Sequence, residues 1–210
     1  MPKIKAVLFD MDGVLIDAKD WHYEALNMAL ALFGMEISRY DHLVTYDGLP
    51  TKKKLEMLTL ERGLPEQLHH FINDIKQEFT FQLAYAKCKP SFNHQYALSQ
   101  LHSKGYRLVS CSNSIRKTMD LMFERAAIKP YFEFYLSNED VKQPKPNPEM
   151  YIEAIKRLNL LPEECLILED NDHGIRAAKA SGAHLLVVAS TQDVNFENIA
   201  KRIQEIECAL

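Results

Sequence analysis

Residues 4–14 read IKAVLFDMDGV, and this stretch decides the fold because an apolar run ends there in two acids. A short, mostly apolar run that a glycine closes is typical of a buried strand in a parallel sheet. Asp10 and Asp12 stand at its carboxyl end, where both side chains would project the same way. Two like charges held this close cost free energy unless a cation or a reaction uses them. A pair of loop acids that cap the next helix is the alternative, and the position of the pair favours a functional role.

Later segments bring further chemistry-bearing side chains to the same edge of a sheet. Residues 106–111, YRLVSC, and residues 165–168, CLIL, read as two more strands, and the run KPNP at 145–148 precedes a helical pattern. Ligands of an open α/β sheet bind at the carboxyl ends of its strands, so we expect the groups near these ends to lie together. They are Ser112, Asn113, Ser114, Lys145, Glu169 and Asp170.

Strand and helix patterns alternate along most of the chain, which predicts an α/β fold built from parallel βαβ units. The strand signal disappears from the end of the first strand until Tyr106, and the intervening segment shows helical spacing. Within it we expect one helix over 20–33, one that Thr51 caps and Gly63 ends, and one with Pro65 in its first turn. The apolar side of the third helix should carry Leu68, Phe71, Ile72, Ile75, Phe79 and Leu83. Past the KPNP run, the helix that Pro148 starts should carry Tyr151, Ile152, Ile155 and Leu158.

The chain thus carries four motifs in order: the Asp10–Asp12 pair, the segment at Ser112, the KPNP run at Lys145, and the Glu169–Asp170 pair. Together they resemble the motifs of the haloacid dehalogenase superfamily in its phosphatase branch. The subgroup resembled contains phosphoglycolate phosphatase and β-phosphoglucomutase. The resemblance implies a Rossmann-like parallel sheet core with helices on both faces and an inserted all-helical cap domain. We therefore expect a core of residues 1–18 and 88–210 and a cap of residues 19–87.

The resemblance also implies the catalytic roles. Asp10 matches the nucleophile that attacks phosphorus, and a carboxylate needs no base because it is ionised at neutral pH. Asp12 matches the acid that protonates the leaving oxygen and later activates water. Ser112 matches the phosphate-binding hydroxyl, with main-chain N–H groups of Asn113 and Ser114 as further donors at a helix N-terminus. Lys145 would offset the charge of nucleophile and phosphate, although Pro144 stands where the motif usually has glycine.

A magnesium ion is the implied cofactor, because oxygen ligands select Mg²⁺ and no His or Cys cluster suggests zinc. By resemblance it would contact the Asp10 carboxylate, the Asp12 main-chain carbonyl and Asp170, with Glu169 assisting directly or through water. Asp172 is an extra acid two residues beyond the matched position. It would either join the metal site, be solvated, or cap the short helix that follows.

Candidate substrate-binding residues in the cap are His22, Gly48, Thr51 and Lys52, which match the hinge and the cap loop of the resembled family. A polar residue on a helix face is the alternative for His22. For the run Lys52-Lys53-Lys54, the alternative is a solvated helix face.

Composition limits the partners. The net charge is −4 and Lys52-Lys53-Lys54 is the only basic tract, so nucleic acid is not expected as a partner, and neither is a membrane. The N-terminus runs directly into the first strand, so we expect no secretory signal. Four cysteines without paired metal-ligand spacing favour reduced thiols and a cytoplasmic location. We expect a monomer or a weak homodimer.

These observations favour a Mg²⁺-dependent phosphatase that acts on a small phosphomonoester, a sugar phosphate first and a nucleotide or phosphoglycolate behind. A 2-haloacid dehalogenase is a rival, against which Asp12 and the Glu169–Asp170 pair argue. A β-phosphoglucomutase-like mutase shares the catalytic set, but Thr51 stands where that family's cap loop presents an arginine. A non-catalytic phosphometabolite-binding protein is the third rival, and it predicts the loss of a catalytic residue, whereas all are present.

Overall fold

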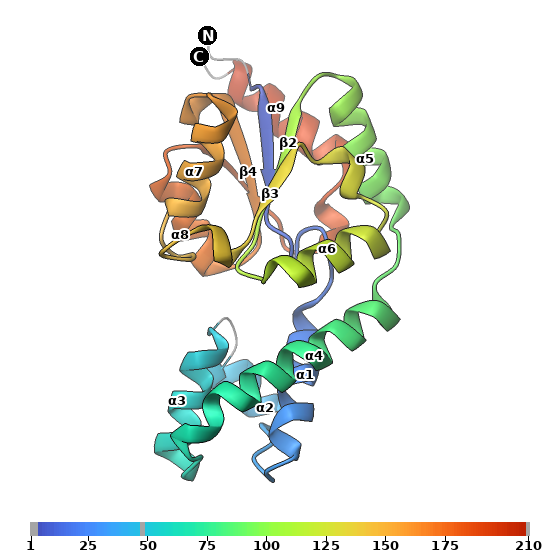
Figure 1. Cartoon of the computed structure of the whole chain (residues 1–210). Helices are drawn as coiled ribbons and strands as arrows, with labels where there is room; N and C mark the ends of the chain where they lie inside the picture. The colour runs from blue at the N-terminus through green and yellow to red at the C-terminus, as the bar shows by residue number, and fades with distance from the viewer. Residues whose placement is uncertain (1–3, 47–48, 209–210) are drawn as a thin grey trace. The chain divides into compact units, whose positions relative to one another are not determined.

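The computed structural model describes residues 4–46 and 49–208, and a five-stranded parallel sheet organises it (Figure 1). The strand order is β3-β2-β1-β4-β5, so the first strand of the chain lies in the middle. The predicted α/β class with a Rossmann-like parallel sheet is confirmed. The strands are β1 (Ala6–Phe9), β2 (Arg107–Cys111), β3 (Phe134–Leu136), β4 (Cys165–Glu169) and β5 (His184–Val187).

β1 forms the centre because every one of its side chains is apolar and buried. It pairs in parallel with β2 on one side and β4 on the other, and Leu8 lies opposite both Val109 and Ile167. A strand covered on both faces gains from apolar residues at every position, not only at alternate ones. This explains why the sequence of β1 is a continuous apolar run.

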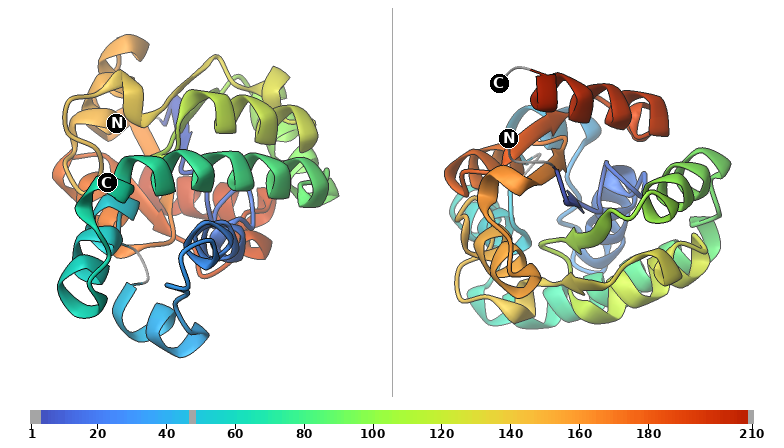
Figure 2. Two further views of the ribbon diagram at one scale, coloured as in Figure 1. Left: turned by 60° about the horizontal axis from the view of Figure 1, so that its bottom comes forward. Right: turned by 90° about the horizontal axis from the view of Figure 1, so that it is seen from above.

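Helices cover both faces of the sheet (Figures 1 and 2). On one face α7 and α8 pack together with β1, β2 and β4 in one apolar cluster, and α5, α6 and α9 lie on the other. Their bounds are α5 (Phe92–Ser103), α6 (Arg116–Arg125), α7 (Glu149–Leu158), α8 (Asp172–Ala180) and α9 (Phe196–Cys208). α7 carries the four apolar residues expected of it, of which Tyr151, Ile155 and Leu158 are buried and Ile152 is 48% exposed. Adjacent helical residues differ by about 100°, so Ile152 projects to one side of the buried face that Tyr151 lies on.

The chain divides into two compact units, Met1–Asp17 with Cys88–Leu210, here the sheet unit, and Ala18–Lys87, here the helical unit. The helical unit has its own core, which includes Leu26, Leu30, Tyr46, Leu58 and Ile72. The segment 19–87 that the sequence singles out as a cap falls inside this unit. Its elements are α1 (Lys19–Ala31), α2 (Arg39–Asp41), the π-helical turn His42–Tyr46, α3 (Thr51–Arg62), the 3₁₀ turn Glu66–Leu68 and α4 (His69–Lys87).

Two predictions about helix starts in this unit are wrong. Thr51 is the first residue of α3 and makes no capping hydrogen bond, because Pro50 occupies the capping position. Pro65 precedes a 3₁₀ turn, and α4 begins only at His69. Proline fixes its own φ and pushes the preceding residue out of the helical region, so both prolines mark a boundary just ahead of where the helix starts.

The predicted apolar side of the helix after Pro65 holds except at Phe71, since Ile72 is buried and Leu68, Ile75 and Phe79 pack against the core of the helical unit. The buried residues of α4 are Ile72, Lys76, Thr80 and Ala84, and Phe71 is exposed. These four recur at intervals of four residues, and α1 is the element with which α4 packs most extensively.

Within the described ranges, each helix is too short or too polar to span a membrane.

Replacing Leu8 by alanine tests the central position of β1. Leu8 is fully buried between two paired strands, so Leu8→Ala should lower the free energy of unfolding by about 2–5 kcal/mol. Leu161→Ala is the matched control, because Leu161 is 57% exposed and its main-chain contact to Glu164 survives the change. Its effect should stay within about 0.5 kcal/mol. Urea titration followed by circular dichroism measures both, and equal effects would contradict this packing.

Candidate active site

The polar groups predicted to gather at the sheet edge come from both sides of β1. Asp10 follows β1, Ser112 follows β2, and Glu169 is the last residue of β4. The chain leaves β1 toward β2 and β3 and later returns to β4 and β5 on the opposite side. Open α/β sheets bind their ligands at the carboxyl ends of the strands beside such a reversal of strand order.

Lys145 lies at the centre of the group. Its Nζ donates to Asp10 Oδ1, to Glu169 Oε1 and to the Cys111 carbonyl oxygen, each at 2.7 Å. An ammonium has three N–H donors, and all three are used. The side chain is buried, so Lys145 is not a solvated loop lysine but the cation of a buried cluster.

The charged groups of this cluster shift one another's pKa. Burial raises the pKa of Asp10 well above its ordinary value and the charge of Glu169 raises it further, while Lys145 acts in the opposite direction. Burial alone would lower the pKa of Lys145, but Asp10 and Glu169 outweigh it and raise that pKa above its usual range. Lys145 therefore stays charged, and the crowded carboxylates favour an additional cation beside them.

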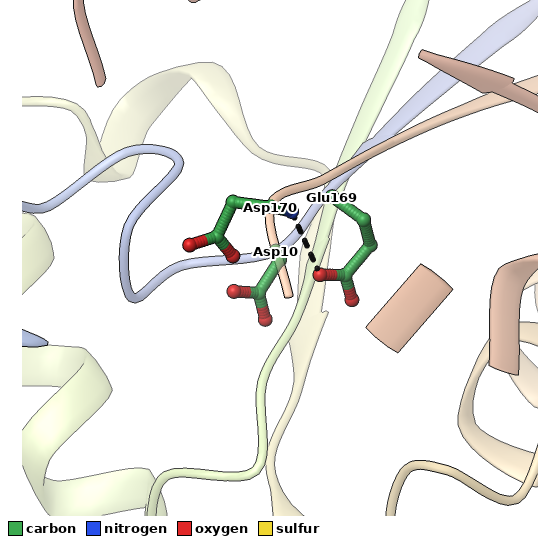
Figure 3. A group of neighbouring side chains, drawn as sticks. All are labelled: Asp10, Glu169 and Asp170. Atoms are coloured by element: carbon green, nitrogen blue, oxygen red, sulfur yellow. Dashed lines mark hydrogen bonds between the residues drawn. The ribbon is translucent and has the colours of Figure 1, made fainter. Parts of the chain in front are cut away.

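Three carboxylates could hold such a cation (Figure 3). Asp10, Glu169 and Asp170 each offer an oxygen atom, and these atoms lie within 4.8 Å of one another. The donors are all carboxylate oxygens, which suit a hard divalent ion such as Mg²⁺. The dashed line in Figure 3 is the hydrogen bond from the Asp170 main-chain N–H to Glu169 Oε2, 3.3 Å long. The donor set of this edge thus fits the expected ion.

Asp172 lies away from this set. It is the exposed first residue of α8, and the capping interaction predicted as one of its roles is made by Asn171, whose side chain accepts from the Gly174 N–H. The capping alternative for Asp172 is therefore wrong, because α8 already begins at Asp172, one residue earlier than that role requires.

Ser114 binds the side chain of Asp12. The Ser114 hydroxyl donates to Asp12 Oδ2 at 2.8 Å, a contact that sequence reasoning missed because it joins residues distant in the chain. Gly13 follows with φ near 90°, in the region that favours glycine, and its N–H donates to the Ile16 carbonyl. The turn at Gly13 carries the chain away directly after the two acids.

The segment after β2 provides the Ser112 hydroxyl and the Asn113 side chain, which binds the main chain of Lys145. Ser112 is buried, and its Oγ accepts from the Ser114 N–H at 3.0 Å, so its own proton is left to point elsewhere. That N–H, expected to face phosphate, is thus used inside the loop. The Asn113 side chain bonds both the N–H and the carbonyl of Lys145, at 3.0 and 3.1 Å. Sequence reasoning assigned only the main chain of Asn113, whereas its side chain fixes the lysine loop.

The candidate residues of the helical unit are arranged around different partners. His22 Nδ1 lies 3.5 Å from Nζ of Lys76, a buried lysine that the predicted apolar stripe of α4 did not include. Thr51 is partly buried and Lys52 is exposed, while Lys54 is buried. The three lysines therefore do not form one solvated face. Gly48 lies outside the described residues.

A family model described as haloacid dehalogenase-like hydrolase matches residues 7–188, a range that includes all of the sheet-edge groups above. The chain belongs to this family. The predicted superfamily is therefore confirmed, and the protein is an enzyme of the hydrolase type.

The chain is also similar to named relatives and to a solved structure. A protein of Thermotoga maritima named "Phosphorylated carbohydrates phosphatase" is 28% identical over 90% of this chain and 88% of its own length. The "Phosphoglycolate phosphatase" of Aquifex aeolicus is 27% identical over 85% of this chain and 82% of its own. The crystal structure of β-phosphoglucomutase from Clostridium difficile has a TM-score of 0.79 at 23% identity, over 96% and 98% of the two chains. That structure supports the shared fold.

The four cysteines should differ sharply in reactivity. Cys88, Cys111 and Cys165 are buried, and burial raises their pKa to about 11, about 12 and about 12. Because the thiolate is the reactive form, only the exposed Cys208 should react rapidly with a charged aromatic disulfide in the native protein at pH 8. The same assay in denaturant should count all four thiols, and Cys208→Ser should abolish the fast phase. A second rapid thiol in the native protein would contradict this packing.

Proposed function

We propose that the protein is a Mg²⁺-dependent phosphatase that hydrolyses a small phosphomonoester through an aspartyl-phosphate on Asp10. The observation that carries this proposal is the buried Lys145 ammonium, which bridges Asp10 and Glu169 beside Asp170. A nucleophilic carboxylate next to a cation and two further acids suits an anionic, phosphorylated substrate better than a haloacid. The relatives named as phosphatases support the same reaction class.

We assign the metal to the Asp10 and Asp170 carboxylates and the Asp12 main-chain carbonyl, with Glu169 assisting. When bound there, Mg²⁺ would offset charge on the phosphoryl oxygens and favour the ionised form of Asp10. The pure oxygen donor set of the cluster is what supports this assignment.

The chain's own residues divide the chemistry. Asp10 attacks phosphorus, and the bond to the leaving oxygen breaks as Asp12 donates its proton to that oxygen. Asp12, now a carboxylate, takes a proton from the water that attacks the aspartyl-phosphate, which frees Asp10 and inorganic phosphate. Ser114 holds the Asp12 carboxyl during both steps. The Ser112 hydroxyl, the Asn113 main-chain N–H and the Lys145 ammonium bind the phosphoryl oxygens.

A sugar phosphate is the proposed substrate. The groups of the sheet unit would bind the phosphoryl group, which all phosphomonoesters share, so selectivity must come from elsewhere. We assign it to the helical unit acting as a cap, through His22, Gly48, Thr51 and Lys52. Lys76 is added because its amine lies beside the His22 imidazole, and the two nitrogens suit hydroxyl or anionic groups. The Thermotoga maritima relative, whose name specifies phosphorylated carbohydrates, supports this class.

A screen of phosphorylated metabolites with and without metal tests the reaction. Release of inorganic phosphate from an aryl phosphate and from sugar phosphates should require Mg²⁺ and stop with EDTA, because the carboxylate cluster needs a cation to admit a phosphate. Chloride release from 2-chloropropionate would instead indicate a dehalogenase. Isomerised sugar phosphate without phosphate release would indicate a mutase, and binding without turnover would indicate a non-catalytic protein.

Substitution of the two aspartates should reduce activity in different ways. Asp10→Asn should abolish turnover, because an amide cannot form the acyl phosphate. Asp12→Asn should lower kcat by about 10²–10⁴-fold for alkyl phosphates and much less for nitrophenyl phosphate, whose leaving group needs no proton. Steady-state kinetics on both substrates measure the difference. Wild-type turnover by Asp10→Asn would rule out this mechanism, and equal losses of Asp12→Asn on both substrates would remove the proton-transfer role.

A further inference from the structure

We propose that Tyr151 is a positioning residue that fixes the Glu169 carboxylate and, through it, the Lys145 ammonium beside Asp10. The inference rests on the proposed function, because it assigns Lys145 to the reacting phosphoryl group. Tyr151 lies on α7 and is fully buried, where helical spacing alone makes it one more core residue.

Tyr151 contacts both partners of the ion pair. Its hydroxyl donates to Glu169 Oε1 at 2.5 Å, and that same oxygen accepts from Lys145 Nζ at 2.7 Å. The ammonium also lies 4.7 Å from the centre of the Tyr151 ring, over its face. One side chain thus supplies a hydrogen bond to the anion and a π face to the cation.

Packing does not account for the hydroxyl. The ring fills a core position among Ala154, Ile155 and Leu158 of the same helix, and phenylalanine would fill it equally well. A buried tyrosine hydroxyl needs a partner, since leaving it without one costs free energy. Here the partner is a carboxylate of the proposed site, so the hydroxyl serves Glu169 and not the core.

Gly174 of α8 confines the same carboxylate from another side. A Cβ added at Gly174 would lie 1.9 Å from Glu169 Oε1 and 2.0 Å from its Cδ, far inside contact distance. Glycine within a helix costs about 1 kcal/mol relative to alanine. At this position the absence of a side chain leaves the space that the Glu169 carboxylate occupies. Residues of two different helices therefore fix a single side chain of β4.

Lys145 and Tyr151 both donate to Glu169 Oε1, so loss of the Tyr151 hydroxyl should also affect Lys145. Without the tyrosine hydroxyl, Glu169 Oε1 would retain the ammonium as its close donor, and the amine would be drawn toward Glu169 and away from Asp10. Charge stabilisation in the transition state depends on where the ammonium stands, so kcat should fall. Substrate binding, which also uses Ser112 and Asn113, should change less.

The test compares Tyr151→Phe, Glu169→Gln and the double variant, with Tyr135→Phe as the matched control. Tyr135 also donates its hydroxyl to a carboxylate of the sheet unit, that of Asp120, outside the site. Two readouts are used: kcat and KM for the best substrate, and the affinity for orthovanadate with Mg²⁺, measured by calorimetry without turnover.

Tyr151→Phe should lower kcat about tenfold and change KM within about threefold, the size expected for one lost hydrogen bond to a charged group. Vanadate affinity should fall about as much as kcat, since vanadate mimics the transition state. In the Glu169→Gln background, adding Tyr151→Phe should change vanadate affinity by less than about twofold, because Tyr151 acts through Glu169. Gly174→Ala, which displaces the carboxylate from the other side, should also weaken vanadate binding. Tyr135→Phe should match the wild type.

Three outcomes would overturn the positioning role: full kcat and vanadate affinity in Tyr151→Phe, equal losses in Tyr135→Phe, or additive losses in the double variant. A wild-type protein that releases no phosphate and binds no vanadate would overturn the proposed function instead. The two failures are therefore distinguishable.

Discussion

The site depends on one buried contact, that of the Lys145 ammonium with the carboxylates of Asp10 and Glu169. A buried ion cluster gains Coulomb energy but loses hydration, so it persists only where each charged group has well-placed partners. The Lys145 amine meets this condition with three acceptors, the third being the carbonyl of Cys111. These acceptors lie at the ends of β1, β4 and β2, so one cation joins three adjacent strands at the edge where chemistry is proposed.

The sheet and the groups at its edge could be predicted from sequence because both follow local rules. Buried parallel strands such as β1 and β4 are continuous apolar runs, and the polar residues that end each run, Asp10 and Glu169 among them, must emerge at the carboxyl edge. Proximity then follows from topology. Lys145 belongs to a loop and not to a strand end, so its expected place at this edge depended on its position between the strand patterns and on the resemblance of the KPNP run.

The contacts that sequence could not predict join polar groups across long separations inside regular elements. Periodicity assigns Tyr151 to a core face and cannot see that its hydroxyl meets a carboxylate on β4. The clamp of Asn113 on Lys145 and the bond from Ser114 to Asp12 likewise join distant residues. In the helical unit, the apolar pattern of α4 could not show that the polar residues Lys76 and Thr80 are also buried.

A lysine that serves a phosphoryl group has to keep its place while the charge of its neighbour changes. When Asp10 becomes an acyl phosphate in the proposed cycle, its carboxyl group loses its negative charge while the phosphoryl oxygens keep theirs, and the N–H that now meets Asp10 Oδ1 is the one free to turn toward them. The other two donors stay on Cys111 and Glu169, whose positions do not depend on the charge of Asp10. Glu169 can act as that constant anchor because Tyr151 and the space left by Gly174 fix it from the helices behind the sheet. Because the Glu169 carboxylate is fixed, the Lys145 ammonium keeps its position beside the reacting atoms throughout the proposed cycle.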